Sequence, residues 1–391
     1  MTWQERYQSL MMNTFGVPKL LLVRGEGSRV WDDEGNEYLD FLAGIAVSAL
    51  GHAHPALVSA IQEQAASLVH ISNYFASEPQ LALAERLQTL TGAGESGRIF
   101  FANSGTEANE GAFKLARRHR AGGRVIALEG AFHGRSMGAL SLTYKETMRA
   151  PFEPLVPGVQ HIPVDLDALQ AALSTGDVAA LFVEAIQGEV GVVTLPDGWL
   201  TEARRLTREA GALLIVDEVQ TGIARTGDWF AFQHEGVRPD AITLAKGLGG
   251  GVPIGAIVAF DEAASLLQPG MHGSTFAGGP LATAAGLAVV TEIERQNLVT
   301  RARDLGVTLR ERLAQIGGER FTNFGGRGLL VGIGLDGDYA AQLGEAAQRH
   351  GVLVNVTGPS RIRLAPPLTI SDAEIDEFLV RFSSALEEVA A

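Results

Sequence analysis

The fold is decided by Ala212-Leu213-Leu214-Ile215-Val216-Asp217, an uninterrupted apolar run that ends on a carboxylate. A run without alternation is typical of a strand buried on both faces of a parallel sheet. Helix-like patterns separate several such runs, and strands that alternate with helices predict an α/β fold with a mostly parallel mixed sheet. The helical patterns are Glu107–His119, Leu166–Leu173 and Leu200–Ala210. The other predicted strands are Arg98–Ala102, Arg124–Glu129, Gln160–Val164, Ala179–Glu184, Ala241–Ala245 and Gly255–Phe260.

Both ends of the chain differ from this central region. After Pro280 a long helical stretch, Leu281–Ile316, is followed by short strands and a last helix. Residues 1–50 contain one strand-turn-strand pattern between Ser28 and Phe41, which is too short to stand alone. We therefore expect a large domain of residues 51–284 and a smaller α+β domain built from residues 1–50 and 285–391. Its predicted strands and last helix are Leu329–Leu335, Val352–Val356, Arg361–Leu364 and Ile375–Val389.

The composition narrows the class of protein. Of the 391 residues, 46% are apolar and 19% are charged, which suits a folded core. The chain has no cysteine, so disulfides, thiolate nucleophiles, zinc–thiolate sites and iron–sulfur clusters are excluded. A net charge of −14 argues against nucleic acid binding. No secretory signal and no membrane span is evident, so we expect a soluble cytoplasmic protein without membrane or nucleic acid partners.

Lys246 is the first residue that points to a reaction. The chain has only four lysines, Lys19, Lys114, Lys145 and Lys246. Lys246 ends an apolar run and precedes the glycine-rich stretch Gly247–Gly251. Desolvation at the end of a buried strand lowers the pKa of a lysine and makes its amine nucleophilic. A strand-end lysine that reaches into solvent is the alternative, and this residue alone does not separate the two.

Two further features complete the requirements of one cofactor. Asp217 ends a strand at the edge of the sheet where α/β folds bind ligands, although an aspartate there can also cap a helix. Asn103–Asn109 follows a strand and starts a helix, where Ser104 or Thr106 can act as the cap and free N–H groups can bind phosphate. A phosphate-binding helix start, a carboxylate and a nucleophilic amine together fit pyridoxal phosphate.

Two short patterns are interpreted as structural. Gly92, Gly94 and Gly97 spell G-x-G-x-x-G, but they precede a strand instead of following one, so we read them as a turn. His52 and His54 resemble a metal pair but have no carboxylate near them in sequence, so no metal site is predicted.

A third pattern supports an alternative of a different class. The stretch Gly134-Arg135-Ser136-Met137-Gly138 spells the G-x-S-x-G of a nucleophile elbow, although several residues separate it from the preceding strand. A serine hydrolase would then use Ser136, with Asp217 and His234 as its acid and base.

Seven stretches of the chain match one family in order and spacing. They are Ser104–Asn109, Phe132–Arg135, Glu184–Glu189, Asp217–Gly222, Leu244–Gly247, Gly273–Phe276 and Arg363–Pro367. Through them the chain resembles the class III aminotransferases of fold type I, in the ornithine/acetylornithine branch. The resemblance implies transfer of the δ-amino group of N-acetylornithine to 2-oxoglutarate, a step of arginine biosynthesis. Residues 42–53 contain no tyrosine, unlike most ornithine-specific relatives, which favours an acylated donor.

The resemblance also implies which residues surround the cofactor. Lys246 would bond to the cofactor aldehyde and then move the reacting proton, and Asp217 would keep the ring nitrogen protonated. The other residues implied to hold the ring, its phenolic oxygen or its phosphate are Ser104, Gly105, Thr106, Phe132, Val219, Gln220 and Thr275. Because Thr275 would come from a second subunit, an obligate homodimer is expected.

On the substrate side, Arg135 would bind the carboxylate of acetylornithine, with Ser274 and Asn73 nearby. Arg363 would bind the α-carboxylate of glutamate, and Glu189 would neutralise Arg363 while acetylornithine reacts. A permanent ion pair, or two unrelated surface charges, is the alternative for these last two residues. Ornithine, 4-aminobutyrate and succinyl-diaminopimelate remain open as donors, as does a protein that binds the cofactor without catalysis.

Overall fold

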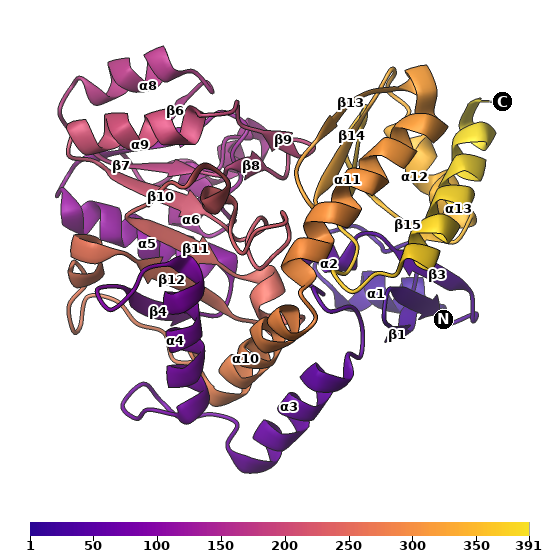
Figure 1. The fold of residues 1–391 in the computed structure, drawn as a ribbon, viewed down its shortest axis with the longest axis horizontal. Coiled ribbons are helices and arrows are strands. Elements are labelled where there is room, and N and C mark those ends of the chain that lie inside the picture. The colour runs from indigo at the N-terminus through magenta and orange to yellow at the C-terminus, as the bar shows by residue number, and fades with distance from the viewer. Residues whose placement is uncertain (391) are drawn as a thin grey trace.

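The computed structural model describes residues 1–390. A seven-stranded sheet forms the centre of the larger part of the molecule (Figure 1). Its strands are β4 (Arg98–Ala102), β5 (Arg124–Leu128), β6 (Val159–Ile162), β7 (Val178–Val183), β10 (Leu213–Asp217), β11 (Ala241–Leu244) and β12 (Gly255–Ala259). They follow the order β4-β12-β11-β10-β7-β5-β6. Only β12 is antiparallel to its neighbours, and all other pairs are parallel. All seven strands predicted for the large domain lie in this sheet, which confirms the mostly parallel mixed sheet.

Helices cover both faces of this sheet, and successive residues of β10 show how. Leu213 and Ile215 pack in one buried cluster with α5 (Gly105–His119). Leu214 and Val216 pack in another with α9 (Trp199–Glu209). A strand with two buried faces must be apolar throughout, which explains the uninterrupted run. Further helices of this part are α4 (Glu78–Thr91), α6 (Met137–Leu142), α7 (Glu146–Arg149) and α8 (Leu166–Leu173).

The second part of the molecule unites the two ends of the chain (Figure 1). One of its sheets contains β1 (Leu22–Glu26), β2 (Arg29–Asp32), β3 (Glu37–Asp40) and β15 (Val352–Leu353). Since β3 pairs in parallel with β15, the N-terminal strands share a sheet with the C-terminal region. The other sheet has the order β13-β14-β17-β16, from β13 (Phe321–Gly325), β14 (Val331–Leu335), β16 (Asn355–Gly358) and β17 (Arg361–Leu364). Its helices are α11 (Leu298–Gly317), α12 (Ala340–Arg349) and α13 (Asp372–Ala390).

The domain limits at residues 50/51 and 284/285 remain a prediction. Helix α10 (Pro280–Arg295) crosses the second limit without a break and contacts both α4 and α3 (Pro55–Ser67). The remaining short elements are α1 (Trp3–Leu10), α2 (Ala43–Ala46), β8 (Ile186–Gln187) and β9 (Val193–Thr194).

Two predicted elements are wrong in detail. The helical stretch Leu281–Ile316 is two helices, because Asn297 between α10 and α11 adopts a left-handed conformation with φ of 52°, which asparagine tolerates better than most residues. The predicted strand Val352–Val356 is divided between β15 and β16, because its first residues pair with β3 and its last with β17. Strands β1 and β13 lie outside the elements predicted from the sequence.

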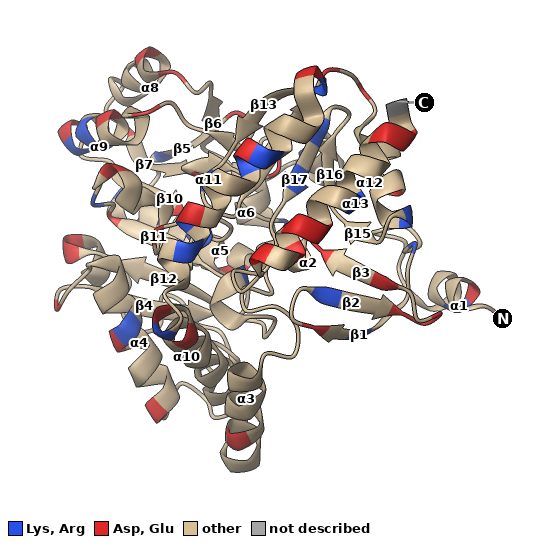
Figure 2. Cartoon of the chain, turned by 45° about the vertical axis from the view of Figure 1, so that its right-hand side comes forward, with Lys and Arg blue, Asp and Glu red and all other residues tan. Residues whose placement is uncertain are grey.

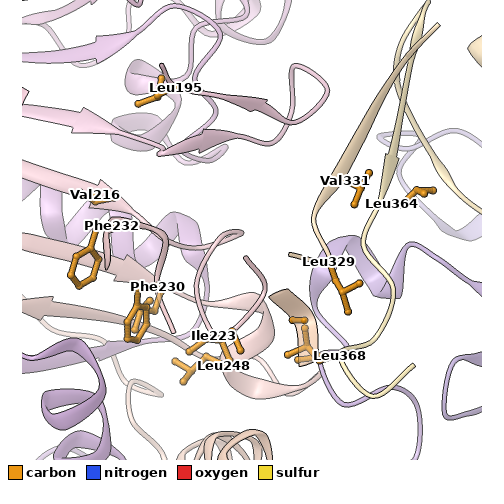
Figure 3. Close-up of a cluster of buried hydrophobic side chains, with 14 of the residues drawn as sticks. Leu195, Val216, Ile223, Phe230, Phe232, Leu248, Leu329, Val331, Leu364 and Leu368 are labelled. Atoms are coloured by element: carbon orange, nitrogen blue, oxygen red, sulfur yellow. The ribbon is translucent and has the colours of Figure 1, made fainter. Parts of the chain in front are cut away.

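An apolar cluster joins the two parts of the molecule (Figure 3). Ile223 and Leu248 of the large part belong to the same cluster as Leu329 and Leu368 of the C-terminal region, and all four side chains are buried. Removing this apolar surface from water favours one relative position of the two parts. Charged residues are scattered over both parts, with acidic and basic positions intermingled (Figure 2). Within residues 1–390, no helix combines the length and the apolar character needed to cross a bilayer.

Candidate active site

A pocket of about 440 Å³ lies at the carboxyl ends of β4, β10 and β11. This edge of the sheet is where α/β folds usually bind their ligands. Ten of the residues predicted as site residues line it, namely Ser104, Gly105, Thr106, Phe132, Arg135, Glu189, Asp217, Val219, Gln220 and Lys246. The fold therefore brings together most of the predicted site.

Lys246 lies two residues after the end of β11 and adopts a left-handed conformation with φ of 45°. Burial, assisted by the positive charge of Arg363, lowers the pKa of Lys246 to about 8. Glu189 and Asp217 oppose this change without cancelling it. A larger fraction of this amine than of an ordinary lysine is therefore unprotonated near neutral pH, as a nucleophile requires.

The carboxylate of Asp217 is held in one orientation by three donors. His133 Nδ1 and Asn109 Nδ2 lie 2.8 and 2.7 Å from Oδ2, and the backbone N–H of Val219 lies 2.9 Å from Oδ1. Burial alone would lower the pKa of His133, but the Asp217 carboxylate outweighs it and raises that pKa. The contact with Asp217 therefore favours the protonated form of His133.

The start of α5 lines one side of the pocket. Ser104 is the N-cap, and its Oγ accepts a hydrogen bond from Glu107 N at 3.2 Å, as its sequence position predicts. The N–H groups of Gly105 and Thr106 then belong to the first turn, where no intrahelical acceptor exists. A Cβ atom on Gly105 would lie 2.7 Å from Cγ1 of Val219, so this close approach requires glycine.

These residues fit pyridoxal phosphate. The N–H groups of the first turn of α5 suit a phosphate, the Asp217 carboxylate suits a protonated ring nitrogen, and the Lys246 amine suits the aldehyde. Ser104, Gly105 and Thr106 at this helix start all line the pocket.

Glu189 and Arg363 form an ion pair beside the pocket. Arg363 lies on β17, is 2% exposed and donates from Nη1 to Glu189 Oε1 at 2.7 Å. The same nitrogen lies 3.1 Å from Oε1 of Gln220 and 3.2 Å from the carbonyl of Gly188. Although burial would raise the pKa of Glu189, the charge and hydrogen bond of Arg363 outweigh it and lower that pKa. Arg363 does not line the pocket of the single chain, whereas Glu189 and Gln220 do.

Asn73, Ser274 and Thr275 also lie outside the lining of this pocket. Ser274 Oγ accepts a hydrogen bond from Asn103 Nδ2 at 2.9 Å, and Asn73 Nδ2 donates to the carbonyl of Ala277 at 2.9 Å. Thr275 is exposed in the single chain.

Four lining residues that sequence reasoning did not select take part in the site. Asn109 and His133 hold Asp217, and Glu184 accepts a hydrogen bond from the backbone of Phe132 at 3.0 Å. Burial raises the pKa of Glu184 to about 7. All three residues belong to matched stretches, which was the available signal. The fourth, Val47, belongs to the stretch Gly44–Val47, which resembles the acetylornithine branch of the family.

Val47 is positioned by a left-handed turn at the edge of the pocket. All residues of α2 have φ between 48° and 65°. The turn begins at Asp40, whose Oδ1 accepts hydrogen bonds from the N–H groups of Leu42 at 3.0 Å and Ala43 at 2.8 Å. This conformation is unfavourable for a β-branched residue such as Ile45 and is typical of functional sites.

The hydrolase arrangement is not assembled. Ser136 Oγ lies 2.6 Å from Oγ1 of Thr106. His234 instead contacts Asp228 at 2.5 Å and Thr226 at 3.2 Å. Asp217 is held by His133, so the three residues of the proposed triad have separate partners.

The two motifs interpreted as structural have structural partners. His52 Nε2 lies 2.8 Å from Asp40, and His54 Nε2 lies 3.6 Å from Glu292, so carboxylates absent from the local sequence are near in space. Over the described part of the chain, no group of three or more His, Cys, Asp or Glu side chains is arranged to hold a metal ion. Gly92 ends α4 in a left-handed conformation, which makes the G-x-G-x-x-G pattern a helix end and turn.

Comparisons with known proteins agree with this site. Residues 12–386 match the class-III aminotransferase family. The chain is 52% identical to an acetylornithine aminotransferase of Streptomyces coelicolor, over 99% of this chain and 96% of that protein. An ornithine aminotransferase structure from Toxoplasma gondii ME49 has a TM-score of 0.95 at 34% identity, covering 99% of this chain and 95% of that one. An N-acetylornithine aminotransferase structure from Stenotrophomonas maltophilia K279a has a TM-score of 0.85 at 35% identity, with 99% of both chains covered.

The chain belongs to the class III aminotransferases, which are pyridoxal-phosphate-dependent enzymes of fold type I. This confirms the predicted fold class, family and cofactor.

Proposed function

We propose that this enzyme transfers the δ-amino group of N-acetylornithine to 2-oxoglutarate, giving N-acetylglutamate 5-semialdehyde and glutamate in arginine biosynthesis. The proposal is supported by full-length similarity to acetylornithine aminotransferases. The observation that carries it is the Glu189–Arg363 ion pair beside a pocket that also contains Lys246 and Arg135. A site that must accept two different donors needs a carboxylate-binding group that can be neutralised.

When bound, pyridoxal phosphate supplies an aldehyde that bonds to amines and a ring that accepts the electrons of the bond being broken. Lys246 Nζ, unprotonated in part at neutral pH, takes the proton from the donor carbon and delivers it again on the cofactor side. The Asp217 carboxylate, oriented by His133 and Asn109, would keep the ring nitrogen of the cofactor protonated. Phe132 and Val219 would hold the ring of the cofactor and exclude water from it, and Gln220 would bind its phenolic oxygen.

The Glu189–Arg363 pair would distinguish the two half-reactions. Glutamate carries a carboxylate on its reacting carbon, and Arg363 would bind it once Glu189 has moved away. N-acetylornithine carries none there, so Glu189 stays on Arg363 and prevents an unpaired buried charge. Arg135 would bind the distal carboxylate of N-acetylornithine as a planar fork, with Asn73 and Ser274 nearby.

A homodimer is part of the proposal. Thr275 and Asn73 are exposed and lie outside the pocket of their own chain. Tyr74 and Phe276, next to them, are 93% and 66% exposed, and large exposed aromatic side chains suggest a covered surface. In a two-fold dimer Thr275 would complete the phosphate site of the partner.

The test is a panel of separate half-reactions on purified enzyme. N-acetylornithine, ornithine, 4-aminobutyrate and succinyl-diaminopimelate are added one at a time, and the loss of the cofactor's visible absorbance is followed. We expect N-acetylornithine to react with the highest kcat/KM. A higher kcat/KM for one of the other three donors would replace the proposed donor and keep the class of enzyme.

Arg135→Ala is expected to lower kcat/KM for N-acetylornithine about 10–100-fold, since a charge-assisted hydrogen bond contributes about 1.5–3 kcal/mol. The side chain is exposed in the single chain, which places the effect in this range and not higher. Arg118→Ala, on the exposed side of α5, is the control and should match wild type. Equal KM values for N-acetylornithine in the Arg135 variant and wild type would contradict this role.

Glu189→Ala is expected to leave the glutamate half-reaction unchanged or faster and to slow that of N-acetylornithine about tenfold. The reason is that Arg363 then lacks its neutralising partner when no substrate carboxylate is present, and an unsatisfied charged group is unfavourable by a kcal/mol or more. Glu189→Gln, which keeps the shape without the charge, should behave in the same way. Single-turnover rates with both donors decide the matter, and equal slowing of both would indicate structural damage instead.

A further inference from the structure

Arg225 is a buried cation that the mechanism does not use. It lies on the loop after β10, and its side chain is 2% exposed. Among the residues that the structure describes, no carboxylate forms an ion pair with it, and burial lowers the pKa of Arg225 to about 9. A buried guanidinium without a counter-charge is unfavourable, so its presence calls for an explanation in its hydrogen bonds.

Its hydrogen bonds join two segments of the C-terminal region. Arg225 Nη1 donates to the carbonyl of Leu329 at 3.2 Å and to that of Pro366 at 2.5 Å. The backbone of Leu329 returns a hydrogen bond, because its N–H donates to the carbonyl of Arg225 at 3.0 Å. Gly328 lies so close that a Cβ atom there would be 2.7 Å from the same carbonyl oxygen. The loop of Arg225 is thus bound tightly to both segments.

Both segments lie at the same end of the antiparallel strand pair that carries Arg363. Leu329 precedes β14 and Pro366 follows β17, and Gly332 of β14 is the register partner of Arg363 on β17 (blue positions on β17 in Figure 2). The loop that carries Arg225 also carries Gln220, which contacts Arg363 directly at 3.1 Å. One loop therefore contacts the side chain of Arg363 through Gln220 and the backbone at one end of its strand pair through Arg225.

We propose that Arg225 is a positioning residue for Arg363. The guanidinium of Arg225 fixes the position of the β14–β17 pair relative to the loop that carries Gln220. The guanidinium of Arg363 is then oriented to bind a substrate carboxylate. A guanidinium can donate to two carbonyl groups of different segments at once, whereas an apolar side chain would leave both without a donor. The inference rests on the proposed function, in which Arg363 binds the α-carboxylate of glutamate. It predicts an effect on one half-reaction and not on the other.

The test measures both half-reactions of the holoenzyme at increasing donor concentration. Arg225→Met should raise the glutamate concentration needed for half the maximal rate about tenfold or more. The corresponding value for N-acetylornithine should stay within about twofold of wild type, because its carboxylate is bound elsewhere. Arg225→Lys, which keeps the positive charge but lacks the planar guanidinium, should fall between the two.

A second variant disturbs the contact between the Arg225 loop and the Leu329 segment without changing Arg225. Gly328→Ala forces its loop away from the backbone of residues 225–227, because the added Cβ meets three backbone atoms within 2.7 Å. It should show the same selective loss for glutamate. Arg117→Met is the matched control, since Arg117 also donates to two backbone carbonyls, those of Gly123 and Pro157, in another part of the molecule. It should leave both half-reactions as in wild type.

Arg363→Ala separates a failure of this inference from a failure of the proposed function. A selective loss of glutamate reactivity in Arg363→Ala, with none in the Arg225 and Gly328 variants, would overturn the inference alone. Equal slowing of both half-reactions in the Arg225 and Gly328 variants would overturn it as well. Equal slowing of both by Arg363→Ala would overturn the role of Arg363 and the inference with it.

Discussion

Lys246→Ala is expected to reduce turnover at least about a thousandfold, since general acid–base catalysis alone contributes up to about 10⁴-fold. One amine performs both the bond to the cofactor and the proton transfers, and alanine can do neither. The helix start at Gly105 and the carboxylate of Asp217 remain in the variant, so cofactor should still bind. Steady-state turnover and cofactor content after dialysis measure the two effects.

The control for this variant is Lys145→Ala, which removes an exposed lysine and should keep full activity. Borohydride should fix the cofactor covalently to wild type and to the control, and not to Lys246→Ala. Turnover within tenfold of wild type in Lys246→Ala would show that another residue is the nucleophile.

Asp217→Asn is expected to lower kcat about 100–1000-fold, the usual effect of removing one electrostatic group aimed at a charge in the reaction. Asparagine keeps the size of the side chain but cannot hold a proton on the nitrogen opposite it. It also leaves His133 without its charged partner at 2.8 Å, which removes the reason for the raised pKa of that histidine. The absorbance of the bound cofactor and kcat at several pH values measure the effect.

Asp165→Asn is a suitable control, because Asp165 caps α8 through Ala168 N at 2.7 Å and asparagine caps a helix equally well. It should be indistinguishable from wild type. A kcat for Asp217→Asn within threefold of wild type would mean that the carboxylate only supports the structure around His133.

Much of the site could be predicted from residues that are close together in the sequence. The apolar run that ends at Asp217 and the run that ends before Lys246 indicate neighbouring strand ends, and both residues do line one pocket. Ser104 could be recognised as a helix cap because capping depends on residues within one turn. The break at Asn297 was missed because the flanking residues on both sides continue a helical pattern.

The hydrogen-bond partners of these residues could not be predicted in the same way. Asp217 is 108 residues from Asn109 and 84 from His133 in the chain. Such contacts depend on how α5 and the loop after β5 pack against the sheet. Glu189 and Arg363 are 174 residues apart in the chain. Their pairing was indicated by resemblance to a family, whereas the residues next to either of them in sequence did not indicate it.

The amino-acid order alone therefore specified the seven strands of the large sheet, a helix start capped by Ser104 or Thr106, and the positions of Asp217 and Lys246 after strands, because these signals arise between residues a few positions apart. Which charges meet was settled by packing of the two parts across the Ile223–Leu368 cluster. That packing placed Arg363 on Glu189 and Arg225 on the backbone of Leu329 and Pro366. A buried charge is stable only where its partners converge in space, and distant segments converge only when the whole chain has folded.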